Sequence, residues 1–210
     1  YMSFGGYSLL GSIRDGSRSQ ASAIAELKES NLRGLGGAGF VAGQKWEIVS
    51  SFDGPRYLTV NLDEGEPGTF KDRNYLERDP LRFLEGLLIA ADIIDAEKSY
   101  IYIRDEYSGG LAILSQAIDE LIEVNLVGPD QIEIRRGAGA YICGEESALI
   151  ESIEGKRGEP RQRPPYVAEK GLFGRPTLVH NFETLYWVRD ILERGASWFT
   201  GFGRRGRKGL

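Results

Sequence analysis

The sequence of 210 residues contains a single cysteine and a single histidine. One thiol allows neither a disulfide framework nor a self-contained iron–sulfur cluster, which needs several thiolates. Cys143, between Ile142 and Gly144, is interpreted as a small buried residue rather than a nucleophile. His180 has no partner at a spacing typical of a triad or a metal site, so the sequence predicts neither.

Long apolar runs are also absent. No stretch of about eighteen apolar residues and no signal-peptide pattern occurs, which predicts no direct membrane insertion. The net charge of −5 comes from interspersed acids and bases, which argues against nucleic acid as the main partner. With the scarcity of cysteine, these absences predict a reducing, cytoplasmic location.

Glycine, by contrast, is abundant: its 28 residues are about twice the usual share. The glycines are clustered and mixed with charged residues, unlike those of a low-complexity linker. Such clusters indicate main chain that approaches another group closely. With 210 residues, of which 41% are hydrophobic, the chain is long enough to bury one core.

Strand-like and helix-like segments alternate along the chain. Strands are predicted at Arg56–Asn61, Tyr100–Arg104 and Ile132–Arg135. Helices are predicted at Ser22–Glu29, from Asp79-Pro80 onward, at Leu111–Val124, from Glu145 onward and at Asn181–Arg194. The alternation predicts an α/β, Rossmann-like fold, in which helices flank a mostly parallel sheet. Residues 1–19, rich in glycine, serine and arginine, are interpreted as an N-terminal arm.

The unusual sequences directly follow the predicted strands. They occupy residues 62–68, 105–107 and 136–146, and two of these three segments combine glycines with neighbouring carboxylates. Open α/β sheets bind ligands in the crevice beyond the carboxyl ends of their strands. Topology alone therefore predicts a binding site where these segments meet.

A further glycine-rich segment, Gly34–Phe40, formally matches G-x-G-x-x-G. The polar, helix-like run before it is not the strand that a standard dinucleotide motif requires. Its consecutive small residues can still expose main-chain amides to a phosphate, with Lys45 as counter-charge. The alternative is a glycine-rich packing turn.

The acidic segments leave several interpretations open. Asp63, Glu64 and Glu66 could hold a divalent cation, accept hydrogen bonds from ribose hydroxyls, or be solvated. The Glu145-Glu146 pair could belong to a site or could cap the following helix. The basic, glycine- and proline-rich residues 155–163 could attract a diphosphate or form a solvated loop.

Several segments together resemble one family in order and spacing. They are LRGLGGAGF, GQKW, NLDEGEPGTFKDR, RRGAGAYICGEESALIESIEGKRGEPR, RPP and GLFGRPTLVHNFETL. Over about residues 30–200, the sequence resembles the FMN- and NADH-binding flavoprotein subunit of respiratory complex I and its relatives in NAD-reducing hydrogenases. RDEY, SIEGKRG and FGRRGRKGL look most like the beta (diaphorase) subunit of soluble NAD-dependent formate dehydrogenases.

The resemblance implies a set of FMN contacts. These are Gly34, Gly36, Gly37, Lys45, Asn61, Asp63, Glu64, Tyr141, Gly144, Glu145, Glu146, His180, Asn181 and Thr184, with Lys45 and the glycines at the phosphate. His180 stands where complex I has asparagine. The NADH contacts implied are Phe40, Glu66, Glu146, Arg163 and Tyr166. Glu66 and Glu146 are predicted to lie at the nicotinamide itself, as the residues closest to the reaction.

The resemblance also implies an organisation and partners. Residues 20–200 are expected to form the FMN/NADH-binding domain, and 201–210 to begin a linker to a ubiquitin-like and [4Fe–4S] region that this sequence lacks. The expected partners are NADH, a thioredoxin-like [2Fe–2S] subunit and a larger iron–sulfur catalytic subunit. FMN would convert the hydride of NADH into single electrons for iron–sulfur clusters.

Two other classes of function compete with this prediction. One is a non-catalytic scaffold that docks partner subunits through its basic loops. The other is a phosphate-handling enzyme with a metal at Asp63, Glu64 and Glu66, which predicts Mg²⁺-dependent hydrolysis and a colourless protein.

Overall fold

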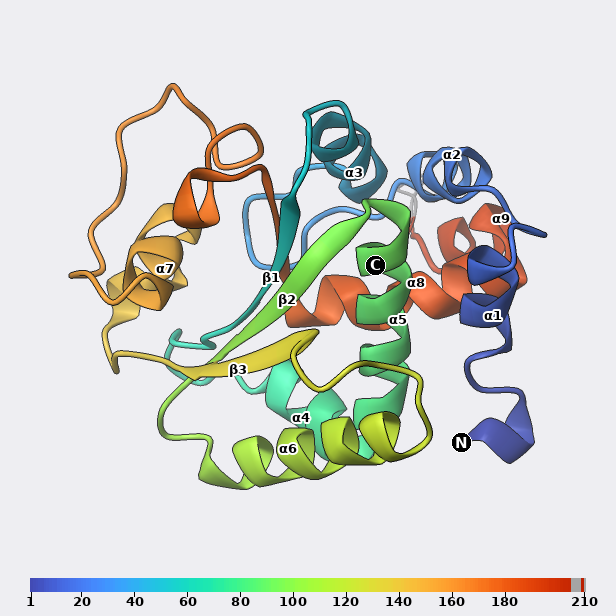
Figure 1. The fold of residues 1–210 in the computed structure, drawn as a ribbon, viewed down its shortest axis with the longest axis horizontal. Coiled ribbons are helices and arrows are strands. Elements are labelled where there is room, and N and C mark those ends of the chain that lie inside the picture. Colours follow the sequence, from blue (N-terminus) through green and yellow to red (C-terminus); the bar gives the residue numbers. More distant parts are fainter. Residues whose placement is uncertain (205–208, 210) are drawn as a thin grey trace.

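The core of the molecule is a four-stranded parallel sheet in the order β3-β2-β1-β4 (Figure 1). The computed structural model describes residues 1–204 and 209. Its strands are β1 (Arg56–Leu62), β2 (Ala96–Ile103), β3 (Ile132–Arg136) and β4 (Thr177–Asn181). The predicted α/β fold with a parallel sheet flanked by helices is therefore confirmed.

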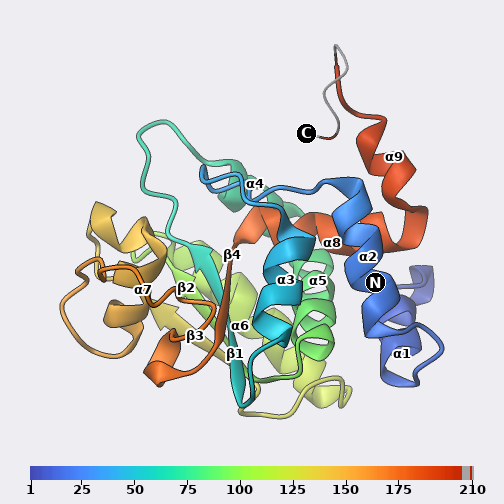
Figure 2. The same cartoon turned by 90° about the horizontal axis from the view of Figure 1, so that it is seen from above.

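Helices cover both faces of the sheet (Figure 2). Those described are α1 (Ser8–Arg14), α2 (Gln20–Ser30), α3 (Ala42–Ser50), α4 (Lys71–Arg78), α5 (Pro80–Ile93), α6 (Ser108–Glu123), α7 (Glu146–Ile153), α8 (Phe182–Arg194) and α9 (Ala196–Thr200). The helices α3, α5 and α8 lie on one face, while α7 and the segment after it lie on the other. Each face thus has its own apolar core, the larger beneath α5 and α8 and the smaller beneath α7.

All three predicted strands and all five predicted helices are present, with boundaries that shift by a few residues. The start of α5 is capped as expected: the Asp79 carboxylate accepts a hydrogen bond from the Arg82 amide (3.1 Å), and Pro80 occupies the first turn. In α2, Ala23 and Leu27 are buried and Ile24 is half-buried, because residues four apart lie on the same face of a helix.

Among the helices and strands described, five were not predicted: α1, α3, α4, α9 and β4. The N-terminal arm contains α1, whose Leu10 and Ile13 are buried against the larger core. Within segment 201–210, residues 205–208 and 210 lie outside the described part of the chain. Among the described residues, no helix combines the length and apolar character needed to cross a bilayer.

The fourth strand changes what the topology predicts. The chain runs from β1 outward to β2 and β3, then returns to place β4 on the other side of β1. The strand order therefore reverses between β1 and β4, and such a switch point opens a ligand-binding crevice at the carboxyl ends of the strands. At that end, Asn61 of β1 and Asn181 of β4 are paired in register.

Candidate functional site

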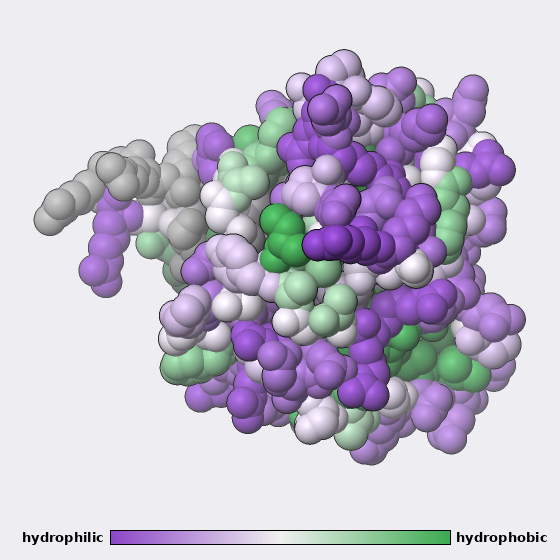
Figure 3. All heavy atoms as spheres, turned by 90° about the vertical axis from the view of Figure 1, so that its left-hand side faces the viewer, coloured by the Kyte–Doolittle hydropathy of each residue, from purple (hydrophilic) through white to green (hydrophobic). Residues whose placement is uncertain are grey.

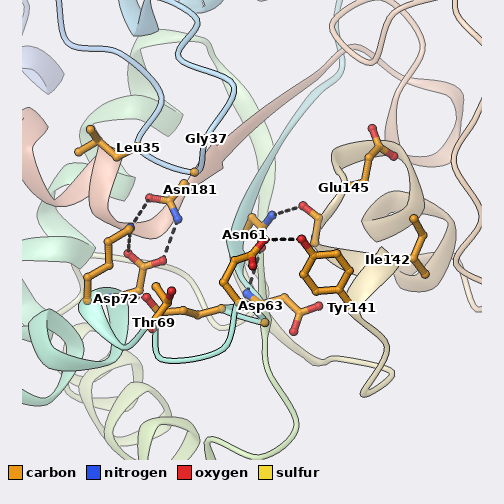
Figure 4. Close-up of a pocket in the computed structure, with 16 residues that line it drawn as sticks. Leu35, Gly37, Asn61, Asp63, Thr69, Asp72, Tyr141, Ile142, Glu145 and Asn181 are labelled. Atoms are coloured by element: carbon orange, nitrogen blue, oxygen red, sulfur yellow. Dashed lines mark hydrogen bonds and ion pairs between the residues drawn. The ribbon is translucent and has the colours of Figure 1, made fainter.

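A cavity of about 490 Å³ lies at the switch point, beyond the carboxyl ends of β1 and β4 (Figure 4). Its walls come from five parts of the chain: the glycine turn, the end of β1 with the acidic segment after it, the start of α4, the segment before α7 and the end of β4. The lining residues are Leu35, Gly36, Gly37, Asn61, Asp63, Glu64, Gly65, Glu66, Thr69, Lys71, Asp72, Tyr141, Ile142, Gly144, Glu145 and Asn181. The structure thus brings the glycine turn and the Glu145 turn into one cleft.

The glycine turn is held at its base and open toward the cavity. The Gly34 amide donates to the Phe40 carbonyl (2.8 Å), and the Leu35 amide donates to Thr184 Oγ1 at the start of α8 (3.0 Å). Gly36 packs so closely that an added Cβ would meet the Asn181 Cβ at 3.1 Å. Gly37 has φ +110° and open space where a side chain would stand. Buried Thr184 therefore positions this turn from behind rather than lining the cavity.

The floor of the cavity is formed by Asn61 and Asp63. Asn61 donates through Nδ2 to the Gly144 carbonyl (2.8 Å) and accepts the Asp63 amide at Oδ1 (3.0 Å), so it joins the acidic segment to the Tyr141–Gly144 turn. Burial raises the pKa of Asp63, opposed by the charge of Arg104. Its Oδ2 is buried without a hydrogen-bond partner among the described residues. A buried, unpaired carboxylate oxygen is costly unless a ligand donates to it.

Glu64 lines the cavity, and its carboxylate holds the start of α4. Its carboxylate accepts the amides of Asp72 (3.0 Å) and Arg73 (3.3 Å) at the start of that helix, and the Tyr107 hydroxyl (3.1 Å). With its oxygens occupied in this way, Glu64 cannot chelate a cation together with its neighbours. In the described residues, no group of three His, Cys, Asp or Glu side chains could hold a metal ion. This geometry disfavours the metal-dependent alternative.

The opposite wall carries Tyr141 and Glu145. The Tyr141 hydroxyl donates to Glu66, which joins the two sides of the cleft. Glu145 is the N-cap of α7: its carboxylate accepts the amides of Ser147 and Ala148, both at 2.9 Å. Glu145 therefore caps the helix, which confirms the capping interpretation, and it also lines the cavity.

Glu146 lies between two cations at the edge of this wall. Lys45 Nζ is 3.0 Å from Glu146 Oε2, and Arg163 Nη2 is 3.3 Å from Glu146 Oε1 and also contacts Glu145. Lys45 does not line the cavity. The sequence prediction placed Lys45 at the glycine turn, whereas the structure directs it toward Glu146.

Three other predicted site residues stand apart from the cavity wall. His180 is buried, and its Nε2 accepts a hydrogen bond from the Trp46 indole (2.7 Å). Burial, and then the charge of Lys45, lower the pKa of His180 well below its ordinary value, so it is a neutral core residue. Phe40 and Tyr166 are exposed and do not line the cavity.

The basic loop after α7 is largely neutralised by its own acids. Lys156 and Arg161 pair with Glu151 and Glu154, and Arg157 pairs with Glu159. Viewed from this side, the surface is mostly hydrophilic, with small separate apolar patches (Figure 3). Attraction of a diphosphate by this loop is correspondingly weakened. Arg163 pairs with Glu145, which lines the cavity.

Sequence reasoning missed Lys71 and Asp72, which line the cavity from the start of α4. Asp72 Oδ2 accepts from Asn181 Nδ2 (2.8 Å), and Asp72 Oδ1 is 2.6 Å from Lys71 Nζ. Burial raises the pKa of Asp72 to about 6, against the opposing charge of Lys71. A signal was available, since both residues lie in the FKDR segment directly after the acidic loop.

The raised pKa of Asp72 predicts a pH-dependent stability. Between about pH 4 and pH 6 the unfolded chain ionises this carboxyl while the folded chain retains the proton, so ionisation favours unfolding. We expect the unfolding free energy of the wild type, relative to Asp72→Asn, to fall by about 3 kcal/mol as the pH rises through that window. Urea unfolding of both proteins from pH 4 to 7 measures this difference. A difference that does not change with pH would contradict the assignment.

Fold and site together define an α/β nucleotide-binding domain, with its pocket at the topological switch point and a glycine turn at one end. Residues 27–190 match the family model described as Nuo51 FMN-binding domain, and the chain belongs to that family.

Known relatives agree with this membership. The chain is 49% identical over 192 residues to the mitochondrial NADH dehydrogenase [ubiquinone] flavoprotein 1 of Dictyostelium discoideum, covering 86% of this chain and 40% of that protein. It is 48% identical over 199 residues to the mitochondrial 51 kDa subunit of the NADH-ubiquinone oxidoreductase of Neurospora crassa, covering 89% and 40%. The air-oxidised NAD⁺-reducing [NiFe]-hydrogenase superposes with a TM-score of 0.84 at 44% identity, covering 91% and 33%. The chain thus spans less than half the length of these relatives.

Proposed function

We propose that this domain binds FMN and NADH and serves as the NADH-oxidising (or NAD-reducing) flavoprotein module of an electron-transfer complex. The observation that carries the proposal is the switch-point cavity, which is lined both by the glycine turn and by Asp63, whose Oδ2 has no hydrogen-bond partner among the described residues. The family match supports FMN as the cofactor.

The residues present fit such a group. A flavin mononucleotide has a phosphate at one end, a hydroxyl-rich chain and a flat ring, and the cavity offers features suited to its polar groups. Gly36 and Gly37 leave the main chain accessible at one end, and the buried Asp63 Oδ2 can accept a hydrogen bond from the ligand. FMN accepts a hydride from a nicotinamide and releases single electrons.

The chain itself supplies orientation rather than covalent chemistry. Asn61 joins the acidic loop to the Tyr141 turn, and the Tyr141–Glu66 hydrogen bond links the two sides of the cleft. Among the described residues that line the cavity there is no serine, cysteine or histidine, the usual members of a nucleophile–base pair. This set of residues suits hydride transfer between a flavin ring and a nicotinamide ring, because the two stacked rings need alignment rather than a nucleophile.

The first test is spectroscopic. We expect the purified protein, supplied with FMN, to show a flavin absorbance band at about 450 nm. NADH, added in the absence of oxygen, should bleach this band. NADH-dependent ferricyanide reduction by the same sample measures turnover. A folded protein that takes up no FMN would favour the scaffold alternative, and Mg²⁺-dependent hydrolysis of nucleotides would favour the phosphate-handling one.

A second test concerns Glu146. We expect Glu146→Gln to change the NADH dissociation constant by about three- to tenfold while FMN retention stays the same, because the variant removes one charge at the edge of the cleft. NADH titration and released-flavin assays measure the two quantities separately. The matched control is Glu159→Gln, which removes a carboxylate paired only with exposed Arg157. Loss of FMN with unaltered NADH affinity would contradict the proposed role.

The proposal also covers the type of multisubunit complex to which this domain belongs. The relatives described above support a complex I or NAD-reducing hydrogenase type more directly than the predicted formate dehydrogenase. We infer that the partners are iron–sulfur subunits, one of them thioredoxin-like with a [2Fe–2S] cluster, that a [4Fe–4S] region belongs to the longer protein, and that the complex is cytoplasmic. Affinity purification of the natural complex, followed by formate-, hydrogen- and quinone-dependent assays, distinguishes the three types.

A further inference from the structure

Two lysines compete for the role of counter-charge to a bound phosphate. Lys45 follows the glycine turn in sequence, but its ammonium group is 3.0 Å from Glu146, and Lys45 is not on the cavity wall. Lys71 lies far from the turn in sequence, yet it lines the cavity with Gly36, Gly37 and Asn181. The close-up shows Gly37, Asn181 and Asp72 at one end of the cavity, and Glu145, Ile142 and Tyr141 at the other (Figure 4).

The surroundings of Lys71 hold its ammonium group in place. Its Nζ is 2.6 Å from Asp72 Oδ1 and 2.9 Å from Glu183 Oε2. Its third contact, to Asn181 Oδ1, is long at 3.4 Å. Burial alone would lower the pKa of Lys71, but the neighbouring carboxylates, Asp72 foremost, raise it, so the group stays charged. Two donors are thus fixed, and the third is weakly engaged beside the cavity.

Two further features of this end suit an anion. The first turn of α8 begins at Asn181, the N-cap, which contacts Gly36 through its Cβ. Main-chain amides at the start of a helix and in a glycine turn both attract negative charge. Asp72 and Glu183 oppose an anion here, and the charge of Lys71 offsets part of their effect.

We infer that Lys71, rather than Lys45, supplies the positive charge that recognises the phosphate of the flavin mononucleotide, next to the Gly36–Gly37 turn. This inference rests on the proposed function and adds a recognition residue to it. It makes a simple chemical prediction: Lys71 distinguishes FMN from riboflavin, which has the same ring and sugar chain but no phosphate.

The test measures the dissociation constants of FMN and riboflavin by flavin fluorescence quenching for the wild type, Lys71→Met, Lys71→Arg and Lys45→Met. We expect Lys71→Met to weaken FMN binding by about tenfold or more, because a charged hydrogen bond is lost, and to leave riboflavin binding within about twofold. Lys71→Arg keeps the charge and should restore most of the preference for FMN. Unchanged riboflavin binding shows that the cavity of the variant is intact.

Three results would overturn the inference. Lys71→Met could weaken both flavins equally, which would make the residue structural, or could weaken neither. Lys45→Met could instead remove the preference for FMN, which would return the role to that residue. If the wild type binds neither flavin, the proposed function fails along with the inference. This result is distinguishable from the other three, because in those the wild type still binds FMN.

Discussion

Replacing Gly36 with valine is expected to weaken FMN binding by about ten- to a hundredfold while the protein remains folded. A Cβ at this position would already meet the Asn181 Cβ at 3.1 Å, so the branched side chain must push the turn away from β4. Leu35 would then lose its amide contact with Thr184 Oγ1 (3.0 Å), and the turn would close on the cavity. Flavin titration measures the affinity, and circular dichroism confirms the fold.

The control for this variant is Gly11→Val. Gly11 lies in α1, where an added Cβ meets nothing within 4 Å, and it is remote from the cavity in sequence and in the fold. It makes the same chemical change without a neighbouring atom to displace, so FMN affinity should stay within about twofold of the wild type. Tight FMN binding by the Gly36→Val protein would show that the turn does not need to approach β4.

The parts of the site that sequence reasoning located share a strong local signal. The acidic segment follows a strand with a clear β-branched and aromatic pattern, and Glu145 precedes an apolar helix. Glycine clusters and carboxylates at such positions indicate a site because the carboxyl ends of parallel strands meet at one edge. The structure places both segments on the same cavity.

The fourth strand could not be found in this way. Thr177–Asn181 is only five residues long, is buried along most of its length and passes directly into α8, so it shows no alternation and no turn before the helix. Because β4 was not predicted, the reversal of strand order could not be predicted either. The same gap hid the reason why Asn61 and Asn181 line one cleft. The helix α4 was missed because it is polar, with only Asp72 and Leu76 buried.

The position of Lys45 relative to the cavity could not be predicted for a related reason. Sequence proximity favoured Lys45 as the partner of the glycine turn, because it follows the turn closely. In the structure α3 carries Lys45 toward Glu146, while the polar helix α4 brings Lys71 to the turn from elsewhere in the chain. A charge at a ligand site is set by tertiary placement, which spacing along the chain does not report.

The largest effect on stability is expected from Gly86→Ala. Gly86 is buried in α5 where this helix crosses α8, and an added Cβ would stand 2.0 Å from the Leu185 carbonyl oxygen and 3.0 Å from its carbonyl carbon. The obstacle is main chain, which no side-chain rotation can relieve, so the two helices must separate. They carry much of the larger core, including Phe83 stacked on Phe182 at 4.0 Å. We expect a loss of about 3 kcal/mol, seen in a thermal melt as a midpoint lower by about 10 °C.

The same substitution at an open position separates this contact from helix propensity. At Gly109 in α6 an added Cβ meets nothing within 4 Å, so alanine there should be neutral or stabilising by up to about 1 kcal/mol. Opposite signs for the two variants would show that the α5–α8 crossing depends on a bare main chain at Gly86. A Gly86→Ala protein as stable as the wild type would mean that the helices cross at a greater separation.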